Sequence, residues 1–205
     1  MRTRIKICGI TRPQDGIAAA AAGADAIGLV FYPPSPRYLS TERAREIRDA
    51  LPPFVQTVAL FVNADAAQVS QVLGAVRPGM LQFHGDETAA FCAQFGTPFV
   101  KACRVKKGVD ALEYLRPFSS AAAWLFDSYV PEYGGVGESF DWSLVPATDK
   151  PVILSGGLSQ SNVAAALRRV RPWGVDVSSG VESAKGIKDA AKIAAFIAEV
   201  GNAHV

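Results

Sequence analysis

The sequence predicts an α/β protein with one domain over residues 1–205, folded as a (β/α)8 TIM barrel. Short apolar runs alternate eight times with patterns typical of amphipathic helices, and no linker or low-complexity stretch separates them. Strands that are apolar on both faces and alternate with helices indicate a parallel sheet covered by helices. Eight such units favour a closed barrel, and 205 residues are enough for a small one.

The expected strands are short runs of branched and aromatic residues. They lie near Arg4–Cys8, Ala26–Val30, Gln56–Phe61, Met80–Phe83, Phe99–Cys103, Ala123–Phe126, Val152–Leu154 and Val175–Val177. An open doubly wound sheet, which is the alternative, usually has a GxGxxG turn after its first strand. Here that turn reads Cys8-Gly9-Ile10-Thr11, which favours the barrel.

A helix is expected after each strand. Ser40 and Asp65 are typical residues at helix starts, and Gly23 and Gly96 are typical of helix ends. The expected helices span Pro13–Ala22, Thr41–Leu51, Ala66–Val76, Glu87–Phe95, Val109–Leu115, Trp142–Val145, Asn162–Val170 and Lys188–Val200.

Charge and composition exclude several classes of partner. The 21 basic and 19 acidic residues leave a formal charge of +2 without an isolated basic cluster, so no nucleic acid is expected. The apolar stretches are too short to cross a bilayer and no signal-peptide core follows Met1–Lys6, so we expect no membrane partner and no export. Three cysteines without a CxxC spacing indicate a reducing cytoplasm and no structural metal.

Reactive side chains occur at the ends of five expected strands. Each comes directly after an apolar run: Cys8, His84, Asp127, Ser155 and Ser178. The carboxyl ends of barrel strands meet at one rim, where the active sites of this fold lie. We therefore expect the chemistry at this rim.

Two turns of small residues close the last two units. Ser155-Gly156-Gly157 follows the seventh expected strand, and Ser178-Ser179-Gly180 follows the eighth. In barrels, backbone N–H groups at these two places commonly bind phosphate. Either segment alone would be an ordinary tight turn, but the pair predicts a phosphorylated small-molecule substrate. The sequence has no GxxxxGK[ST] motif, so a nucleoside triphosphate is not expected.

Cys8 is a candidate general base. A base must be the thiolate, so the site has to supply positive potential, and Lys6 on the same strand face is one source. Most buried cysteines are small hydrophobic residues, and this is the interpretation for Cys92 and Cys103.

Two carboxylates also need an explanation. Asp127 is either a general acid, which must hold a proton near neutral pH, or the cap of a helix or turn. Asp176 interrupts the eighth strand, where an unpaired charge is costly. It either points into the barrel and binds substrate or a lysine, or it forms a structural ion pair with Lys6.

A set of motifs covers nearly the whole chain in order. It comprises Lys6-Ile7-Cys8-Gly9-Ile10-Thr11, Phe31-Tyr32, Ser35-Pro36-Arg37-Tyr38, Phe61-Val62-Asn63, Leu81-Gln82-Phe83-His84-Gly85, Phe126-Asp127, Tyr133-Gly134-Gly135, Phe140-Asp141-Trp142, Leu154-Ser155-Gly156-Gly157-Leu158 and Asp176-Val177-Ser178-Ser179-Gly180-Val181-Glu182. Together these motifs resemble the phosphoribosylanthranilate isomerase family of tryptophan biosynthesis.

The resemblance implies an Amadori rearrangement of N-(5-phosphoribosyl)anthranilate to 1-(2-carboxyphenylamino)-1-deoxyribulose 5-phosphate, without cofactor or metal. It makes Cys8 the general base and Asp127 the general acid. Arg37 matches the family's clamp for the anthranilate carboxylate, and a planar guanidinium suits that group. His84 matches a histidine that either contacts substrate or only forms a hydrogen bond in the barrel mouth. Barrels of this size occur as monomers and as homodimers, and both states stay open.

One segment departs from the family pattern. Val136 in Gly134-Gly135-Val136-Gly137 stands where the family usually has Thr or Ser, so a hydroxyl is missing from that loop. We expect loop closure to survive because the glycines and Phe140-Asp141-Trp142 remain.

Two other classes of function stay in view. A histidine-pathway isomerase would have Asp in place of Cys8, and a ribulose-phosphate epimerase would need metal-binding histidines, whereas the chain has only His84 and His204. A non-catalytic phosphate-binding barrel would have lost the acid or the base, and Cys8 and Asp127 are both present.

Overall fold

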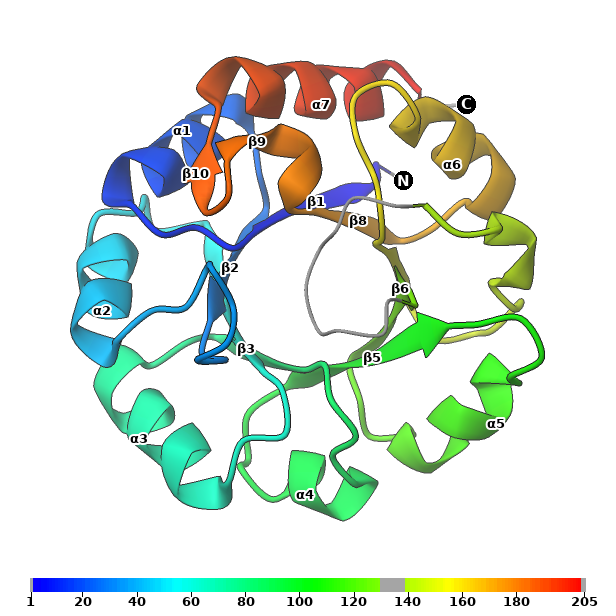
Figure 1. The fold of residues 1–205 in the computed structure, drawn as a ribbon, viewed down its shortest axis with the longest axis horizontal. Helices are drawn as coiled ribbons and strands as arrows, with labels where there is room; N and C mark the ends of the chain where they lie inside the picture. Colours follow the sequence, from blue (N-terminus) through cyan, green and yellow to red (C-terminus); the bar gives the residue numbers. More distant parts are fainter. Residues whose placement is uncertain (1, 130–138, 204–205) are drawn as a thin grey trace.

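The computed structural model describes residues 2–129 and 139–203 and confirms the predicted fold class. Its centre is a closed parallel barrel in which each strand pairs with the next and β8 closes on β1 (Figure 1). The strands are β1 (Arg4–Cys8), β2 (Ala26–Val30), β3 (Gln56–Phe61), β4 (Met80–Phe83), β5 (Phe99–Val105), β6 (Ala123–Ser128), β7 (Val152–Leu154) and β8 (Gly174–Val177).

Strands β5 and β6 extend two residues beyond their expected ends. The extension pairs Arg104 with Asp127 and Val105 with Ser128. Asp127 is therefore part of β6 rather than the first residue after it. Because its backbone belongs to the sheet, strand pairing fixes the position of its Cα at the rim.

A ring of helices surrounds the barrel (Figure 1). The α-helices are α1 (Pro13–Ala22), α2 (Thr41–Asp49), α3 (Ala66–Val76), α4 (Ala89–Ala93), α5 (Ala111–Leu115), α6 (Val163–Val170) and α7 (Ala190–Asn202). The side chains of Ser40, Asp65, Thr88, Asp110 and Asp189 accept hydrogen bonds from backbone N–H groups at helix starts, which stabilises those termini.

Only the helices expected over Pro13–Ala22 and Ala66–Val76 have the predicted bounds; the ends of the others differ, and three of these differences have a clear cause or change the element. The helix expected from Glu87 begins only at Ala89, because Thr88 is the cap. The helix expected over Trp142–Val145 is one 3-10 turn, η2 (Trp142–Leu144). Lys188, the expected start of the last helix, instead belongs to the hairpin β9 (Glu182–Ala184) and β10 (Ile187–Lys188). The other 3-10 helices are η1 (Arg116–Phe118) and η3 (Ser179–Val181).

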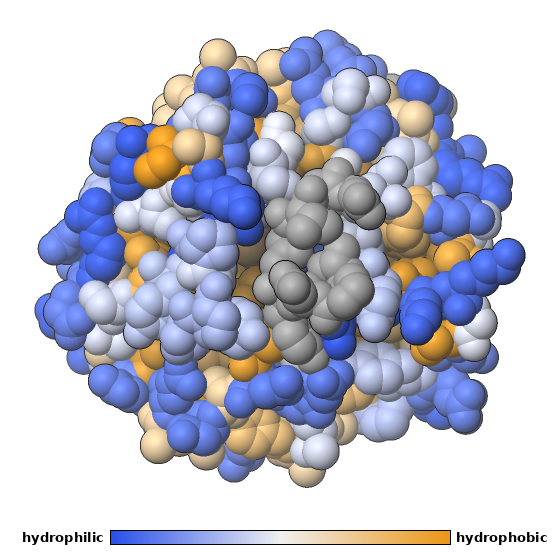
Figure 2. Space-filling view, in the orientation of Figure 1, coloured by the Kyte–Doolittle hydropathy of each residue, from blue (hydrophilic) through white to orange (hydrophobic). Residues whose placement is uncertain are grey.

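Apolar side chains fill the space between barrel and helices and also the barrel interior. Phe61 stacks between Phe31 and Phe83, with ring centroids 5.6 and 6.1 Å away. A separate buried cluster of Cys8, Val30, Leu60 and Val62 lies at the mouth of the barrel. Hydrophilic residues are prominent around the edge of the face shown in Figure 2. Among the described residues, no helix has the length and hydropathy needed to span a membrane.

Candidate active site

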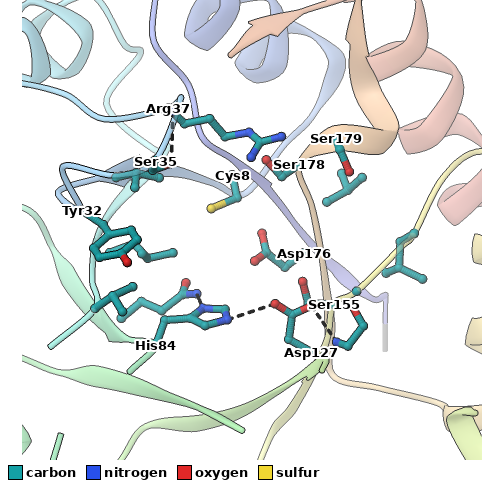
Figure 3. Close-up of a pocket in the computed structure, with 18 of the residues that line it drawn as sticks. Cys8, Tyr32, Ser35, Arg37, His84, Asp127, Ser155, Asp176, Ser178 and Ser179 are labelled. Carbon is teal, nitrogen blue, oxygen red and sulfur yellow. Dashed lines mark hydrogen bonds and ion pairs between the residues drawn. The ribbon is translucent and has the colours of Figure 1, made fainter. Parts of the chain in front are cut away.

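The five reactive residues expected at the rim line one pocket (Figure 3). They come from β1, β4, β6, β7 and β8 or from the residue that follows each strand: Cys8, His84, Asp127, Ser155 and Ser178. The pocket encloses about 810 Å³, part of it open to solvent, and Arg37 and Asp176 also line it.

Cys8 is buried at the end of β1 and its sulfur points into the pocket (Figure 3). Gly28 is its neighbour on β2, and a Cβ added there would come within 2.6 Å of the Cys8 sulfur. The glycine therefore makes room for the thiol, a role that the sequence analysis did not identify. Its position inside an apolar strand was the available signal, because such glycines mark close approaches.

Burial raises the pKa of the Cys8 thiol, and the nearby charges only partly offset this effect. The Lys6 ammonium lowers the pKa, as the sequence analysis expected, whereas the Asp176 carboxylate raises it. The net shift is upward. At neutral pH the thiol form is therefore favoured over the thiolate.

Lys6 and Asp176 form a buried ion pair across β1 and β8. Lys6 Nζ lies 2.8 Å from Asp176 Oδ1, and their side chains are 8% and 4% exposed. Burial lowers the pKa of Lys6, but the Asp176 and Cys8 charges outweigh burial and the pKa is raised. The ion pair that was one of the two expectations for Asp176 is present. Asp176 also lines the pocket, so a substrate contact by this residue stays a prediction.

Asp127 is held by two hydrogen bonds. Its Oδ1 accepts from the Ser128 backbone N–H at 2.8 Å, and its Oδ2 lies 3.0 Å from His84 Nε2. Gln82 Nε2 lies 3.0 Å from His84 Nδ1, so its amide donates to that nitrogen. A neutral imidazole that accepts at Nδ1 carries its proton on Nε2 and donates it to Asp127.

Gln82 is a second residue that the sequence analysis missed. It lies inside β4, is 1% exposed and lines the pocket. It occurred in the motif Leu81-Gln82-Phe83-His84-Gly85 without an assigned role. A buried amide two residues before a rim histidine lies on the same strand face, which was the available signal.

Arg37 lies at the pocket in the loop after β2, where it was expected, but its guanidinium already has a partner. Its Nε donates to Glu182 Oε1 at 2.7 Å and its Nη2 donates to Glu182 Oε2 at 2.8 Å. Burial favours a higher pKa for Glu182, but Arg37 and Lys188 outweigh it and lower the pKa below its usual value. Neither Glu182 nor Lys188 was assigned a role in the site from the sequence.

The two small-residue turns pack against neighbouring backbone. Gly156 and Gly157 have φ angles of +83° and +59°, which glycine adopts without steric cost. A Cβ at Gly156 would overlap the Ser128 backbone nitrogen, and a Cβ at Gly180 would overlap the Leu158 carbonyl oxygen.

Four of the five expected phosphate-binding residues lie at the pocket. Gly156, Gly157, Ser178 and Ser179 line the pocket. Gly180 is not among the lining residues; it instead allows the turn after β8 to contact the turn after β7. The segment Gly134–Gly137 with Val136, and also His204, lie outside the described residues.

Comparison with known proteins gives concordant matches. The model of the family described as N-(5'phosphoribosyl)anthranilate (PRA) isomerase matches residues 5–199. An N-(5'-phosphoribosyl)anthranilate isomerase from Dechloromonas aromatica is 54% identical over 204 residues, which are 99% of this chain and 98% of the relative. One from Pseudomonas paraeruginosa is 57% identical over 95% of this chain and 93% of the relative.

Solved structures agree with these matches. A crystal structure of phosphoribosyl anthranilate isomerase from Thermotoga maritima has a TM-score of 0.90 and 42% identity, with 98% of this chain and 99% of that chain covered. A second isomerase structure, in complex with reduced 1-(o-carboxyphenylamino)-1-deoxyribulose 5-phosphate, has a TM-score of 0.87 and 39% identity over 98% of this chain and 99% of that chain.

Proposed function

Because the chain belongs to the N-(5'-phosphoribosyl)anthranilate isomerase family, we propose that its pocket performs the isomerisation by acid–base chemistry of its own side chains. The substrate is then N-(5-phosphoribosyl)anthranilate and the product 1-(2-carboxyphenylamino)-1-deoxyribulose 5-phosphate. The observation that supports this proposal most is the placement of Cys8 and Asp127 in one pocket. The rearrangement requires only a general acid that gives a proton to the substrate and a general base that removes one, so no cofactor is needed.

Asp127 acts as the general acid in this proposal. Its protonated form gives a proton to the ring oxygen of the ribose and becomes the carboxylate, the C1–O bond breaks, and the nitrogen lone pair forms a C=N bond to C1. The hydrogen bond between Asp127 Oδ2 and His84 Nε2, 3.0 Å long, orients the carboxyl group for this step. His84 is therefore a positioning residue here.

Cys8 acts as the general base. The thiolate is the minor form of Cys8, which the Lys6 ammonium favours. It removes the proton from C2 of the sugar, and the electron pair moves into the C1–C2 bond to give an enolamine. The enolamine becomes the ketone when C1 gains a proton and the C2 hydroxyl loses one. Cys8 and Asp127 are on β1 and β6, with β7 and β8 between them in the closed barrel. The acid and the base therefore approach the sugar from different sides.

The substrate has two anionic ends that need partners. Arg37 offers a planar set of N–H donors to the anthranilate carboxylate. The backbone N–H groups of the turns at Gly156-Gly157 and Ser178-Ser179 offer donors to the phosphate. These roles make the pocket specific for a phosphosugar that carries an aryl carboxylate.

A fluorescence assay of N-(5-phosphoribosyl)anthranilate consumption tests the proposal. The purified protein should remove the anthranilate adduct far faster than the uncatalysed background. Cys8→Ala and Asp127→Ala should each abolish turnover while the circular dichroism spectrum stays that of the wild type. No turnover by the wild-type protein would refute the function, and near-normal turnover by either variant would refute the role of that residue.

A further inference from the structure

Arg37 and Glu182 form a buried, two-bond ion pair beside the pocket. The Nε and Nη2 groups of Arg37 donate to the two carboxylate oxygens of Glu182, and the side chains are 7% and 6% exposed. Glu182 belongs to β9, the hairpin strand that follows η3. Two parallel hydrogen bonds fix the guanidinium in orientation as well as in position.

The pair leaves one edge of the guanidinium for another acceptor. A guanidinium has five N–H donors, and two of its edges can each bind a carboxylate through two parallel hydrogen bonds. Glu182 occupies the edge formed by Nε and Nη2 of Arg37. Within residues 2–129 and 139–203, no side chain is hydrogen-bonded to the edge formed by Nη1 and the second Nη2 hydrogen, so this edge is available to a substrate carboxylate.

Lys188 connects this ion pair to the turn after β8. Its Nζ lies 2.9 Å from Glu182 Oε1, 3.0 Å from the Ser178 carbonyl oxygen and 3.2 Å from Ser178 Oγ. The Lys188 side chain is fully buried. Figure 3 shows the Arg37 guanidinium and Ser178 next to each other at the rim of the pocket.

The charges of the three side chains also fit this role. Two buried cations, Arg37 and Lys188, share one carboxylate, so the cluster keeps a single positive charge. Two buried cations without Glu182 would repel each other, and neither would have the opposite charge of Glu182 to offset the cost of burial. Glu182 therefore makes the cluster stable and still attractive to an anion.

We propose that Glu182, together with Lys188, is a positioning and specificity-determining residue for the aryl carboxylate of the substrate. It holds Arg37 so that the free guanidinium edge meets the carboxylate, and Lys188 holds Glu182 in turn. This inference rests on the proposed function, because it takes the substrate to carry both groups.

Glu182→Gln is the most informative variant. Glutamine keeps the size of the side chain but cannot accept hydrogen bonds through both of its terminal atoms. The two ligands to compare are reduced 1-(2-carboxyphenylamino)-1-deoxyribulose 5-phosphate and the same compound without the carboxylate, measured by calorimetry. The affinity for the first should fall about tenfold, because a charge-assisted hydrogen bond is lost. The affinity for the second should stay within about twofold of the wild type, because the phosphate contacts remain.

Two controls separate positioning from general damage. Glu46→Gln also removes the carboxylate of an Arg ion pair, but that pair is exposed on α2 (side chain 58% exposed) and should leave both affinities unchanged. If Glu182 acts through Arg37, the Glu182→Gln change should have no further selective effect in an Arg37→Lys background.

The outcomes distinguish the two proposals. Absence of turnover by the wild-type protein refutes the proposed function. Normal wild-type turnover with equal loss of both ligands in Glu182→Gln, or with no loss, refutes the positioning role. If Glu182→Gln fails to fold, Glu182→Asp takes its place: it keeps the charge with shorter reach and should again weaken only the carboxylate-bearing ligand. Equal weakening of both ligands by Glu182→Asp would also overturn the inference.

Discussion

Lys101 on β5 is the strongest candidate for a stability effect outside the pocket. Its side chain is fully buried, and its Nζ lies 2.9 Å from Glu87 Oε2 and also donates to the Gly85 carbonyl oxygen. The rings of Phe118 and Tyr114 have centroids 5.3 and 5.8 Å from the same nitrogen. The buried ammonium therefore has a carboxylate, a carbonyl oxygen and two aromatic rings as partners.

Lys101→Met should destabilise the protein by about 3 kcal/mol. Methionine has nearly the same length, so no large cavity forms, but Glu87 is left buried without its cation. Breaking a buried pair in this way costs roughly 3–5 kcal/mol. We expect the lower end because Glu87 still accepts from the Asn63 and Gly85 backbone N–H groups at 2.8 and 3.0 Å. In a protein of this size the loss corresponds to about 6–12 °C in Tm.

Urea unfolding followed by circular dichroism measures this loss. The double variant Lys101→Met with Glu87→Gln removes the uncompensated charge, so it should be clearly more stable than Lys101→Met alone. The reasoning is wrong if the two substitutions add, because a lost packing contribution and not a stranded carboxylate would then account for the effect.

Three further predictions follow from the pocket and the core. Lys6→Met removes the charge that lowers the pKa of Cys8, so the acidic limb of the kcat/KM profile should move to higher pH; an unchanged limb contradicts this. Burial raises the pKa of Cys92 from 9.0 to about 12. Above pH 9.0 the folded state therefore keeps a proton that the unfolded chain releases, so the free energy of unfolding should fall as the pH rises. Cys92→Ala should flatten that slope in urea titrations at several pH values. Gly28→Ala should lower kcat at least about tenfold by displacing the Cys8 thiol, whereas Gly74→Ala, where a Cβ has nothing within 4 Å, should not.

The strands of the barrel could be predicted because each is a short apolar run with its own boundaries. The ends of β5 and β6 were predicted too short, since Arg104, Asp127 and Ser128 are polar. These residues are nevertheless in the sheet because the two strands pair with each other beyond the apolar part. Pairing between strands is a property of two segments together, and the composition of one segment does not reveal it.

Two of the predicted helix starts that were wrong are charged residues. Glu87 and Lys188 were predicted as the first residues of helices, but each precedes its helix and each is buried. Each has a partner in another part of the chain, Lys101 for Glu87 and Glu182 for Lys188. Burial of a charge depends on such a partner, so these two positions could be understood only after the chain was folded.

In the candidate site, too, some residues could be predicted from one stretch of sequence, and others only from the contacts between strands. The groups proposed to transfer protons were predicted because they stand where apolar runs end. The residues that tune them lie on adjacent strands: Gly28 is next to Cys8, and Asp176 is next to Lys6, in the registers of β1 with β2 and β8. Once eight strands are placed in a closed barrel with a defined register, these neighbours follow from the sequence. A glycine or an aspartate inside an apolar barrel strand is therefore best interpreted together with the residue beside it on the next strand. The neighbouring side chain is the reason why the position holds a small or a charged residue.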